Sequence, residues 1–203
     1  MAVKSPASRS QRTGDETRQA LLEAAREQFG QKGYAATLTE DVVAQAGVTK
    51  GALYHHFGGK AELFAAVYEQ VKREISDQIA EVFMGRDAWA SLVGGCRRQI
   101  DAQLDPAVRR IVLSDARAVL GWDEVRRIDT QHGGVALRGA LRKAMVAGVL
   151  ERQPLRPLSL MLSGALSESV FYVAEADDPD IARSEVDALL QRILEGLRTD
   201  GGS

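Results

Sequence analysis

Residues 37–60 constrain the fold of this chain most strongly, because they encode two short helices separated by a glycine. The T-x-x-E spacing from Thr37 to Glu40 is typical of a capping box at a helix start. Gly47 can end that helix, and Thr49 can cap a second helix that stops at the next pair of glycines. Two short helices around a glycine turn predict a helix-turn-helix, whose second helix enters the major groove of DNA.

The second of these helices has one apolar side and one side suited to DNA. Leu53 and Phe57 are four residues apart and can anchor the helix to the core. On the exposed side, Lys50 can donate to guanine, Ala52 can touch a thymine methyl, and Gly51 lets the backbone approach the bases. Nearby hydroxyl, histidine and lysine side chains are suited to phosphate oxygens. The candidate DNA-binding residues are Thr39, Thr49, Lys50, Gly51, Ala52, Tyr54, His55 and Lys60.

The adjacent histidines His55 and His56 raise the alternative of a metal site. Neighbouring residues on a helix point to different faces, so two adjacent histidines are poorly placed to bind one ion. No further histidine or cysteine lies nearby in the sequence, and His132 is far along the chain. The sequence therefore predicts neither a metal nor a cofactor. His55 is assigned to phosphate contact and His56 to a structural role.

A longer helix is predicted on each side of this pair. Thr13 and Glu16 have the spacing of a further capping box, and an apolar face then leads to Gly33 as the helix stop. A long amphipathic helix begins near Lys60. The basic N-terminus is expected to be disordered. The predicted organisation is a tail at 1–13, a DNA-binding domain at 14–60 that continues into a connecting helix to about 84, and a second domain at 85–203.

Residues 15–71 resemble the N-terminal domain of TetR-type bacterial transcriptional regulators. The resemblance lies in the stretches LLEAAREQFGQKGYAAT and AGVTKGALYHHFGGKAELFAAV. It implies a three-helix DNA-binding domain, an all-helical C-terminal domain for ligand binding and dimerisation, and operator binding that a small molecule relieves. It also implies that bases are read by Lys50, Gly51 and Ala52, and that phosphates are held by Tyr54, His55 and Lys60.

Two positions in the first helix of the pair depart from the family's pattern. Glu40 stands where the family often has an arginine or another neutral-to-basic residue, and Val43 stands where it commonly has a smaller alanine. Glu40 suits the positive end of the helix dipole, but it lies on the side that faces phosphate. These departures concern the part that the first helix plays in base reading, and they leave the fold unaffected.

The remaining two-thirds of the chain is predicted to be a series of helices, which makes the fold all-α. Proline directly after aspartate is typical of a helix start, and an internal glycine is typical of a break. The predicted boundaries are a start at Asp105-Pro106, a break at Gly121, a helix over 122–149, a loop bracketed by Pro154 and Pro157, a helix over 158–175 and a last helix from Asp178-Pro179.

Residues 158–175 are apolar on most of the predicted helix surface and include several small residues. Such a helix must be buried on most of its surface, either as an ordinary core helix or against a second copy of the chain. The family resemblance implies a four-helix dimer interface from the last two helices of each subunit. The candidate interface residues are Met161, Gly164, Ala165, Val170, Val186, Leu190, Ile193 and Leu197.

A ligand pocket is expected between the helix that begins near Lys60 and the segments 106–120 and 122–149, near Gly133-Gly134. Each glycine costs about 1 kcal/mol relative to alanine in a helix interior. The pair marks either a helix that ends and restarts or a kink that opens space for a ligand. The candidate lining residues are Trp89, Gln99, Asp115, Trp122, Arg126, Asp129, His132, Met145, Phe171 and Tyr172.

Charge and motif content bear on the class of function. Residues 1–60 hold eight Lys/Arg against six Asp/Glu, a balance of +2, whereas residues 61–203 hold eighteen against twenty-two, a balance of −4. A basic N-terminal region on an acidic body favours a polyanionic partner. The sequence contains no P-loop, dinucleotide-binding motif or catalytic constellation, so no enzymatic activity is expected.

The expected compartment is the cytoplasm. No apolar run is long enough to cross a bilayer, and the lone Cys96 is expected as a core residue in a reducing environment. The predicted function is a sequence-specific regulator that binds a pseudo-palindromic double-stranded DNA operator as a homodimer. Repression relieved by an unknown small-molecule ligand is favoured, because a bound dimer occludes DNA sterically. An activator of the same fold and a helical interaction scaffold are the alternatives.

Overall fold

The computed structural model describes residues 7–199, with side chains from residue 14 onward except at positions 130 and 133. No β-strand forms within this range, although Leu150 and Arg198 make an isolated antiparallel bridge. The all-α prediction is confirmed. The helices are α1 Ala7–Lys32, α2 Thr39–Ala46, α3 Lys50–Phe57, α4 Lys60–Phe83, α5 Ala88–Leu104, α6 Pro106–Arg109, the π-helix η1 Arg110–Asp115, α7 Ala116–Ile128, the π-helix η2 Asp129–Gly133, α8 Val135–Val146, α9 Leu155–Glu175 and α10 Pro179–Glu195.

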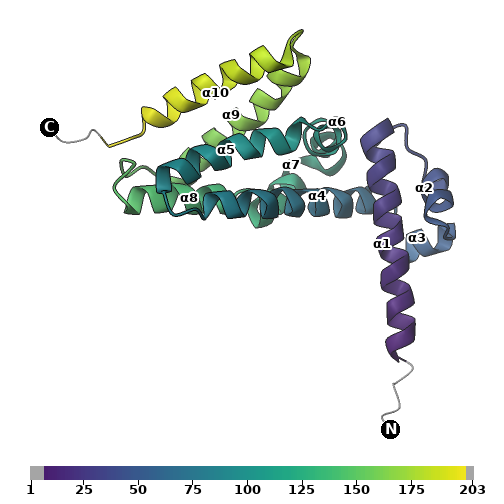
Figure 1. Cartoon of the computed structure of the whole chain (residues 1–203). Helices are drawn as coiled ribbons and strands as arrows, with labels where there is room; N and C mark the ends of the chain where they lie inside the picture. The colour runs from purple at the N-terminus through teal and green to yellow at the C-terminus, as the bar shows by residue number, and fades with distance from the viewer. Residues whose placement is uncertain (1–6, 200–203) are drawn as a thin grey trace.

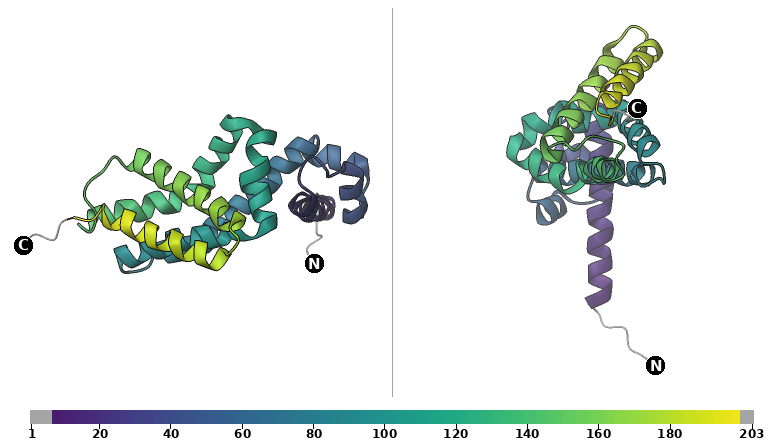
Figure 2. Two further views of the ribbon diagram at one scale, coloured as in Figure 1. Left: turned by 90° about the horizontal axis from the view of Figure 1, so that it is seen from above. Right: turned by 90° about the vertical axis from the view of Figure 1, so that its left-hand side faces the viewer.

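Helix α4 joins the two halves of the molecule (Figure 1). Near its start α4 packs against α1, and α2 and α3 lie on the side of α1 that faces away from the rest of the chain. Further along, α4 packs against α5, α7 and α8. Helices α9 and α10 lie side by side at the opposite end, as Figure 2 shows from two directions. We call the part of the chain that follows the contact between α1 and α4, from the rest of α4 to α10, the C-terminal body.

Aromatic rings join α1 to α4 at the centre of the N-terminal half. Phe29 and Phe64 are fully buried, and their ring centroids lie 5.1 Å apart in an edge-to-face arrangement. The ring of Tyr34, in the loop after α1, lies 5.3 Å from Phe64. Val42 of α2 and Leu53 of α3 are buried in the same core. The two short helices are therefore held in place by their apolar positions, as predicted for Leu53.

α1 and α2 do not begin at the residues that the two capping boxes predict. α1 is helical from Ala7, so Thr13 lies inside it and does not start it. The predicted tail is therefore helical from residue 7, and its first six residues lie outside the described range. Thr37 is fully buried, and its Oγ1 donates to the carbonyl of Gly33 at 2.8 Å. Because this hydroxyl closes the turn after α1, it does not cap α2, which begins two residues later, at Thr39.

The turn between α2 and α3 forms as predicted. Gly47 adopts the left-handed conformation, with φ 66°, and ends α2. The side chain of Thr49 accepts a hydrogen bond from the backbone N–H of Ala52 at 3.2 Å and so caps α3. Gly58, with φ 87°, ends α3, and α4 starts at Lys60. The predicted helix-turn-helix is confirmed.

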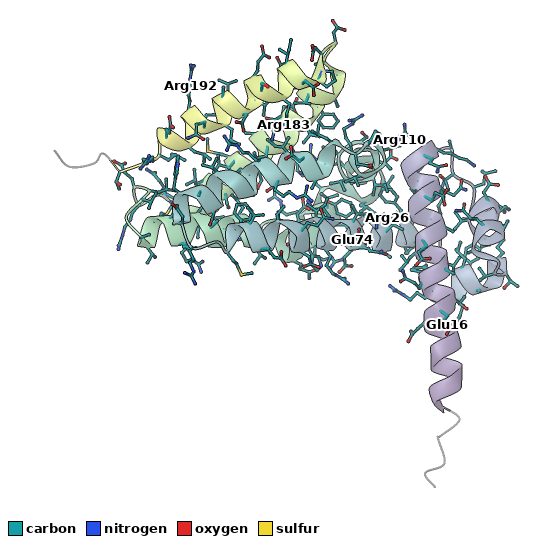
Figure 3. All side chains as sticks on the ribbon, in the orientation of Figure 1. Glu16, Arg26, Glu74, Arg110, Arg183 and Arg192 are labelled. Carbon is teal, nitrogen blue, oxygen red and sulfur yellow. The ribbon has the colours of Figure 1, made fainter. Side chains whose placement is uncertain are left out.

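Polar contacts fasten α1 to the C-terminal body (Figure 3). Arg26 of α1 and Glu74 of α4 form an ion pair at 2.6 Å. Arg110, at the start of η1, donates to the carbonyl of Gly30 at 3.0 Å and also to that of Gln31. These carbonyls belong to the last turn of α1, which has no helical partners for them. Arg110 therefore caps α1 from the body.

The same junction also contains a close backbone approach. Gly30 is buried, and a Cβ placed on it would lie 2.7 Å from the Cβ of Ala107 in α6. Glycine at this position therefore lets α1 and α6 touch. One turn further on, the backbone N–H of Tyr34 donates to Oδ2 of Asp115 at 2.8 Å. The segment from α6 to η1 thus holds the end of α1 by packing and by hydrogen bonds.

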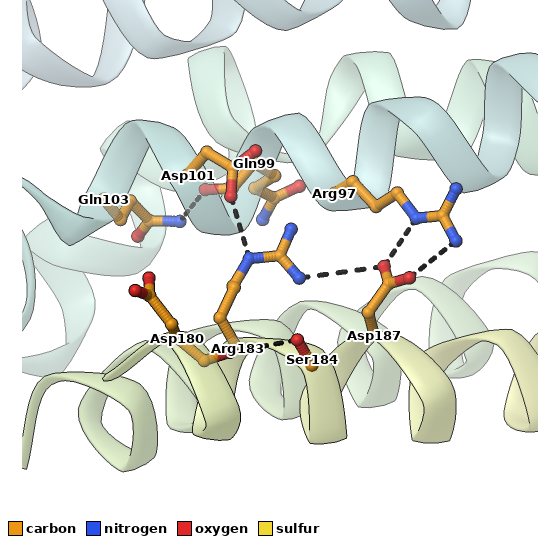
Figure 4. A network of polar contacts seen from close by, with 8 residues as sticks. All are labelled: Arg97, Gln99, Asp101, Gln103, Asp180, Arg183, Ser184 and Asp187. Carbon is orange, nitrogen blue, oxygen red and sulfur yellow. Dashed lines mark hydrogen bonds and ion pairs between the residues drawn. The ribbon is translucent and has the colours of Figure 1, made fainter. Parts of the chain in front are cut away.

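Helix α10 is fastened to α5 by a network of ion pairs (Figure 4). Arg97 donates to Asp187 with an Nη2–Oδ2 distance of 2.7 Å, and Arg183 donates to Asp101 with an Nε–Oδ1 distance of 2.9 Å. Arg183 also lies 3.7 Å from Asp187, which links the two pairs. Because these groups are only partly buried, the network contributes more to the placement of α10 than to overall stability.

Gly121 breaks the backbone as predicted, with φ 75° and ψ 169°. The predicted helix over 122–149 is wrong, because η2 and Gly134 divide it and α8 starts only at Val135. The chain therefore ends one helix and restarts another at the glycine pair.

The predicted loop between Pro154 and Pro157 is also wrong. α9 begins at Leu155, so Pro157 lies in its first turn. The first N–H groups of a helix have no intrahelical acceptor, and a proline in that turn therefore removes no hydrogen bond. The cap at Asp105 and the start of α10 at Asp178-Pro179 are as predicted: each aspartate side chain accepts backbone N–H groups of its helix's first turn.

Helix α9 is less buried than its composition predicts. By length and composition alone α9 could cross a membrane. Of its most apolar stretch of 18 residues, 28% is buried inside the chain. Leu162, Leu166 and Val170 face the core, whereas Met161 is 73% exposed. This helix does not stand out in the sequence as one long apolar run, because serines interrupt its apolar residues. One chain alone leaves much of the apolar surface of α9 uncovered.

Candidate DNA-binding face and ligand cavity

Helix α3 presents one side to the core and the other to solvent. Leu53 is fully buried, and Phe57 is half-buried beneath Arg18, whose guanidinium lies 5.2 Å from the ring centroid. These contacts fix the rotation of α3. The opposite side carries the predicted base-reading and phosphate-binding positions, and four of them are exposed. The exposed residues are Lys50, Gly51, Tyr54 and His55, and Ala52 is half-buried.

An ion pair connects the two helices of the motif on this face. Nζ of Lys50 lies 2.7 Å from Oε1 of Glu40, and Oγ1 of Thr39 donates to Oε2 of Glu40 at 3.0 Å. The hydrogen bond from Lys50, with smaller effects of the Glu40 backbone and Thr39, lowers the pKa of Glu40 to about 2. The carboxylate is therefore ionised at neutral pH. Two candidate DNA contacts thus share one acidic partner, a connection that the sequence analysis did not detect.

The remaining candidate DNA-binding residues differ in their surroundings. Thr49 is exposed while it caps α3, and because its oxygen acts as the acceptor in that cap, its O–H can still donate to DNA. Lys60 is half-buried, and its ammonium lies 4.3 Å from the ring centroid of Tyr34. Burial lowers the pKa of Lys60. A phosphate contact by Lys60 would therefore require its side chain to turn away from this ring.

The adjacent histidines His55 and His56 contact one another on α3. The rings of His55 and His56 meet edge to face, with centroids 5.3 Å apart. Among the side chains that the structure describes, no group of three or more His, Cys, Asp or Glu residues could hold an ion. His55 is exposed and His56 is half-buried. His55 is thus available to a partner, while His56 packs toward α1.

A cavity of about 310 Å³ lies between α4, α5, α7, α8 and α9. This is the region where the sequence predicts a ligand pocket, next to Gly134. Four of the predicted lining residues line it: Gln99, Trp122, Arg126 and Asp129. The deepest of them is Gln99, which is 8% exposed, while Trp122 is 61% exposed at the mouth. The cavity therefore reaches from the helical core to the surface.

Two predicted lining residues make other contacts instead. Trp89 lies beneath Arg198, whose guanidinium is 4.8 Å from the ring centroid, and this contact joins α5 to the end of the chain. His132 Nε2 lies 3.1 Å from Oε1 of Glu69 on α4. Both contacts fasten elements of the body to one another. Neither side chain lines the cavity.

The other predicted lining residues are also placed elsewhere. Asp115 accepts the backbone N–H of Tyr34 and so belongs to the junction with α1. Met145 is partly buried against the core. Phe171 is half-buried on α9, and the hydroxyl of Tyr172 donates to Glu185 of α10 at 2.5 Å. Size and polarity alone selected these residues, and neither property reports the direction in which a side chain points.

Several residues that line the cavity were absent from the sequence-based set. They come from five helices, so no local spacing connects them. The sequence feature nearest to them is the glycine pair. Its second member makes room for a lining residue, since a Cβ on Gly134 would lie 2.3 Å from Nη1 of Arg138. The lining residues missed by the sequence analysis are Lys72, Gln103, Arg117, Val125, Gly134, Arg138, Ser159, Leu160, Ser163, Gly164 and Ser167.

The predicted dimer-interface residues fall into two groups. Val170, Val186 and Leu190 are 0%, 7% and 7% exposed, so they lie in the chain's own core and leave no side chain for a partner. Leu197 is half-buried against that core. The candidates that remain on the surface are Met161, Gly164, Ala165 and Ile193. Exposed apolar residues that were not predicted lie on the same two helices: Leu160, Tyr172, Ile181 and Leu189.

The geometry first defines a class of protein. A short, capped helix is rotated so that its polar and basic side faces outward, and it follows another short helix across a glycine turn. This is the arrangement of a helix-turn-helix DNA-binding protein.

Comparisons with known proteins identify the family. Residues 21–67 match the family model of bacterial regulatory proteins of the tetR family, and residues 89–197 match that of the tetracyclin repressor-like C-terminal domain. The chain belongs to the TetR family of bacterial transcriptional regulators, and it is a DNA-binding regulator of transcription.

Individual relatives agree with this assignment. The transcriptional regulator TtgR of Pseudomonas putida is 30% identical over an alignment of 161 positions that covers 71% of this chain and 75% of that protein. The transposon Tn10 TetC protein of Escherichia coli is 31% identical over 116 residues, 57% of this chain and 59% of that protein. A TetR-family regulator from Pectobacterium atrosepticum has a solved structure with a TM-score of 0.78 and 34% identity, covering 97% of this chain and 99% of that one.

Proposed function

We propose that the protein is a repressor that binds a pseudo-palindromic operator as a homodimer and leaves it when a small molecule occupies the cavity. The observation that carries this proposal is the outward face of α3, where Lys50, Gly51, Tyr54 and His55 are exposed around a buried anchor. A bound dimer would exclude other proteins from the DNA that it covers, which favours repression over activation. We place its action in the cytoplasm, where bacterial DNA lies.

Each residue of this face has a distinct proposed role. Lys50 donates to a guanine edge, and Gly51 and Ala52 allow the helix to approach the groove floor closely. Tyr54 and His55 donate to phosphate oxygens and fix the register of the helix. Glu40 holds Lys50 in the free protein at 2.7 Å, so base contact by Lys50 requires that this pair opens or shifts.

We propose that the homodimer forms through α9 and α10. A groove of about 640 Å³ runs between these helices on the outer surface, and Ala165, Tyr172 and Leu189 are among the residues that line it. Met161 is 73% exposed and Ile193 is 51% exposed on the same two helices. Exposed apolar side chains gathered on two neighbouring helices are typical of an interface. A second copy would cover it by symmetry, each subunit contributing both helices.

Release from DNA requires that the ligand binds the DNA-incompetent conformation more tightly than the competent one. Arg117 and Trp122 of α7 line the cavity, and α7 follows directly on η1. From η1, Arg110 and Asp115 hold the end of α1. We propose that a shift of α7 on ligand binding reaches α1 through η1 and changes the spacing of the two α3 helices in the dimer. By reciprocity, DNA must weaken ligand binding by the same factor.

The test is selection of random-sequence duplexes on the full-length protein, followed by protection mapping. The expected product is a pseudo-palindrome whose half-site centres lie about 34–36 Å or a multiple apart. Lys50→Ala should weaken the selected site on the order of tenfold or more and relax preference at one base pair per half-site. Arg142→Ala, at an exposed position on α8, is the matched control and should change neither.

The outcomes separate the alternatives. Equal loss of binding to all duplexes would make Lys50 a phosphate contact and remove its base-reading role. Protection of a single asymmetric half-site would contradict binding as a dimer. A selection that enriches no sequence would leave the helical interaction scaffold as the better description of this chain. An activator would select the same kind of site, but a promoter fused to it would gain expression when the protein is present.

A further inference from the structure

The cavity wall carries an excess of positive charge. Its lining includes four cationic residues, Lys72, Arg117, Arg126 and Arg138, and one acidic residue, Asp129. This balance is opposite in sign to that of the chain's last 143 residues, which hold more acids than bases. A concave wall with one sign of charge attracts ligands of the other sign. The positive charge of the wall therefore favours an anionic occupant of the cavity.

The single carboxylate of the wall already has partners within the protein. Nζ of Lys72 lies 2.9 Å from Oδ1 of Asp129, and the hydroxyl of Tyr68 donates to the same oxygen at 2.9 Å. Burial, together with the nearby Asp129 carboxylate, raises the pKa of Tyr68, so the hydroxyl remains a donor. The Lys72 side chain is 15% exposed and that of Asp129 is 41% exposed, so water screens this pair in part. Asp129 thus pairs with Lys72, and the arginines add further positive charge to the wall.

The lining of the cavity includes a buried amide side chain. Gln99 lines the cavity and is 8% exposed, and its Oε1 accepts no hydrogen bond from the residues that the structure describes. A buried acceptor that is left unsatisfied is unfavourable, so an occupant with a donor would gain from meeting it. Ser159, which is 4% exposed, lies on the same wall; its O–H donates to the carbonyl of Arg156 at 2.9 Å, so its oxygen is left as an acceptor. This part of the wall therefore suits hydrogen-bonding groups.

The mouth of the cavity combines a ring with cations. The guanidinium of Arg117 lies 4.5 Å from the ring centroid of Trp122, which is 61% exposed. Arg138 packs over Gly134, where any Cβ would collide with its guanidinium at 2.3 Å. The absence of a side chain at Gly134 therefore makes room for Arg138 in the wall. Guanidinium groups bind planar carboxylates with two parallel hydrogen bonds.

We propose that the cavity binds a small organic carboxylate, whose anionic group meets the arginines and whose hydroxyl or other donor meets Gln99. This inference rests on the proposed ligand-controlled function, and it specifies the class of that ligand. The cavity volume of about 310 Å³ is at the small end of ligand pockets, which run from roughly 300 to 1,000 Å³. A compact acid with one ring fits this size better than a long acyl chain.

The binding test uses the full-length protein without DNA. Benzoate, salicylate and 4-hydroxybenzoate are each paired with their neutral amide and tested up to millimolar concentration by thermal shift and calorimetry. At least one acid should raise the unfolding temperature, and its amide should not. Inorganic phosphate is included at the same concentrations, because it presents the same charge without an organic body. The acid should bind more tightly than phosphate.

Three variants assign the effect to the cavity. Arg138→Gln and Arg117→Gln should each weaken binding of the acid roughly tenfold to a hundredfold, the loss typical of a charge-assisted hydrogen bond. Gln99→Met should leave the stability of the free protein near that of the native chain while weakening the hydroxylated acids. Arg127→Gln is the matched control, because Arg127 lies on the outer face of α7, paired with Glu124 at 2.6 Å. That control should bind as the native protein does.

The results decide between the inference and the proposed function. Stabilisation by amides as strong as by acids, equal stabilisation by phosphate, or no stabilisation by any acid would overturn the inference. Acid binding that survives both arginine changes would overturn it as well. Operator affinity is measured separately, with and without the bound acid. An acid that binds through the arginines but leaves operator affinity unchanged would support the ligand class and remove ligand-controlled release.

Discussion

The contact between Gly30 and Ala107 offers a quantitative test of how α1 is joined to the body. In Gly30→Ala, the new Cβ would lie 2.7 Å from the Cβ and 3.3 Å from the Cα of Ala107, so α6 or α1 must move. Overpacking of a filled site costs about 1–3 kcal/mol. The change also gains up to about 1 kcal/mol, because alanine is a better helix former than glycine. The net loss of stability is therefore expected between about 0 and 3 kcal/mol.

A double-mutant cycle separates the clash from the helix propensity. In the Ala107→Gly background, the Cβ that Gly30→Ala would strike is gone, while the propensity gain at position 30 remains. The interaction energy of the cycle should therefore approach the overpacking cost, about 1–3 kcal/mol. For a chain of this size, about 1 kcal/mol corresponds to a shift of about 2–4 °C in the unfolding temperature. The four proteins are compared by thermal and denaturant unfolding at one protein concentration.

Operator affinity is the second measurement, because this contact lies between the DNA-binding helices and the body. Gly139→Ala is the control, since Gly139 is exposed on α8 and a Cβ there meets no atom within 4 Å. Gly139→Ala should leave the unfolding temperature unchanged or raise it, and it should leave operator affinity unchanged. An interaction energy within about 0.5 kcal/mol of zero would mean that the two changes are independent. In that case α1 and α6 do not touch as described, and the junction is looser than the structure indicates.

Three further predictions concern the DNA-binding face, the junction with α1 and the proposed dimer interface. Glu40→Gln should free Lys50 for DNA and remove a charge that repels phosphate, so operator binding should tighten and the slope of log K against log salt should steepen by up to about 1; weaker binding would mean that Glu40 positions Lys50 for the base. Asp115→Ala should lower the unfolding temperature by about 2–4 °C through loss of a hydrogen bond worth about 1 kcal/mol, and calorimetry that finds no change would remove this contact from the junction. Ile193→Asp should yield monomers in sedimentation, whereas Val146→Asp, at a position 81% exposed on α8, should not; a dimer that survives Ile193→Asp would place the interface elsewhere.

Sedimentation of a Gly164 variant would be a less direct test of the same interface. Gly164 is exposed on α9, but it also lines the cavity. A bulky residue there would change ligand binding and dimerisation together. Ile193 lies on α10, away from the cavity wall, and so separates the two effects.

The helix-turn-helix could be predicted from sequence because its signals are local. Gly47 needs a left-handed backbone, and the hydroxyl of Thr49 reaches a donor three residues away. Local signals also have limits. The hydroxyl of Thr37 had two acceptable uses, a helix cap or a bond to the carbonyl of Gly33, and only the folded turn after α1 decides between them. The pairing of Glu40 with Lys50 likewise depends on how α2 and α3 cross.

The cavity could be located from sequence only approximately. The glycine pair indicated its neighbourhood, yet most of its lining comes from helices far apart in the chain. The family resemblance likewise implies α9 and α10 as interface helices, but the sequence does not indicate which side of each helix faces outward. Leu189 and Leu190 are adjacent leucines, and they are 58% and 7% exposed. The rotation of α10 depends on its ion pairs and packing with α5, which no spacing within α10 encodes.

The continuity of α4 has a consequence for how this protein can be divided. Leu63 and Phe64 near its start are buried with α1, and Ile79 and Phe83 near its end are buried with α5 and its neighbours. All four belong to one hydrophobic cluster that extends from α1 to α10. A fragment cut after α4 would expose the second pair to water, and a cut before α4 would remove Phe64 from Phe29. Chimaeras that exchange the DNA-reading part should therefore keep α4 with its own body and graft only the face of α3.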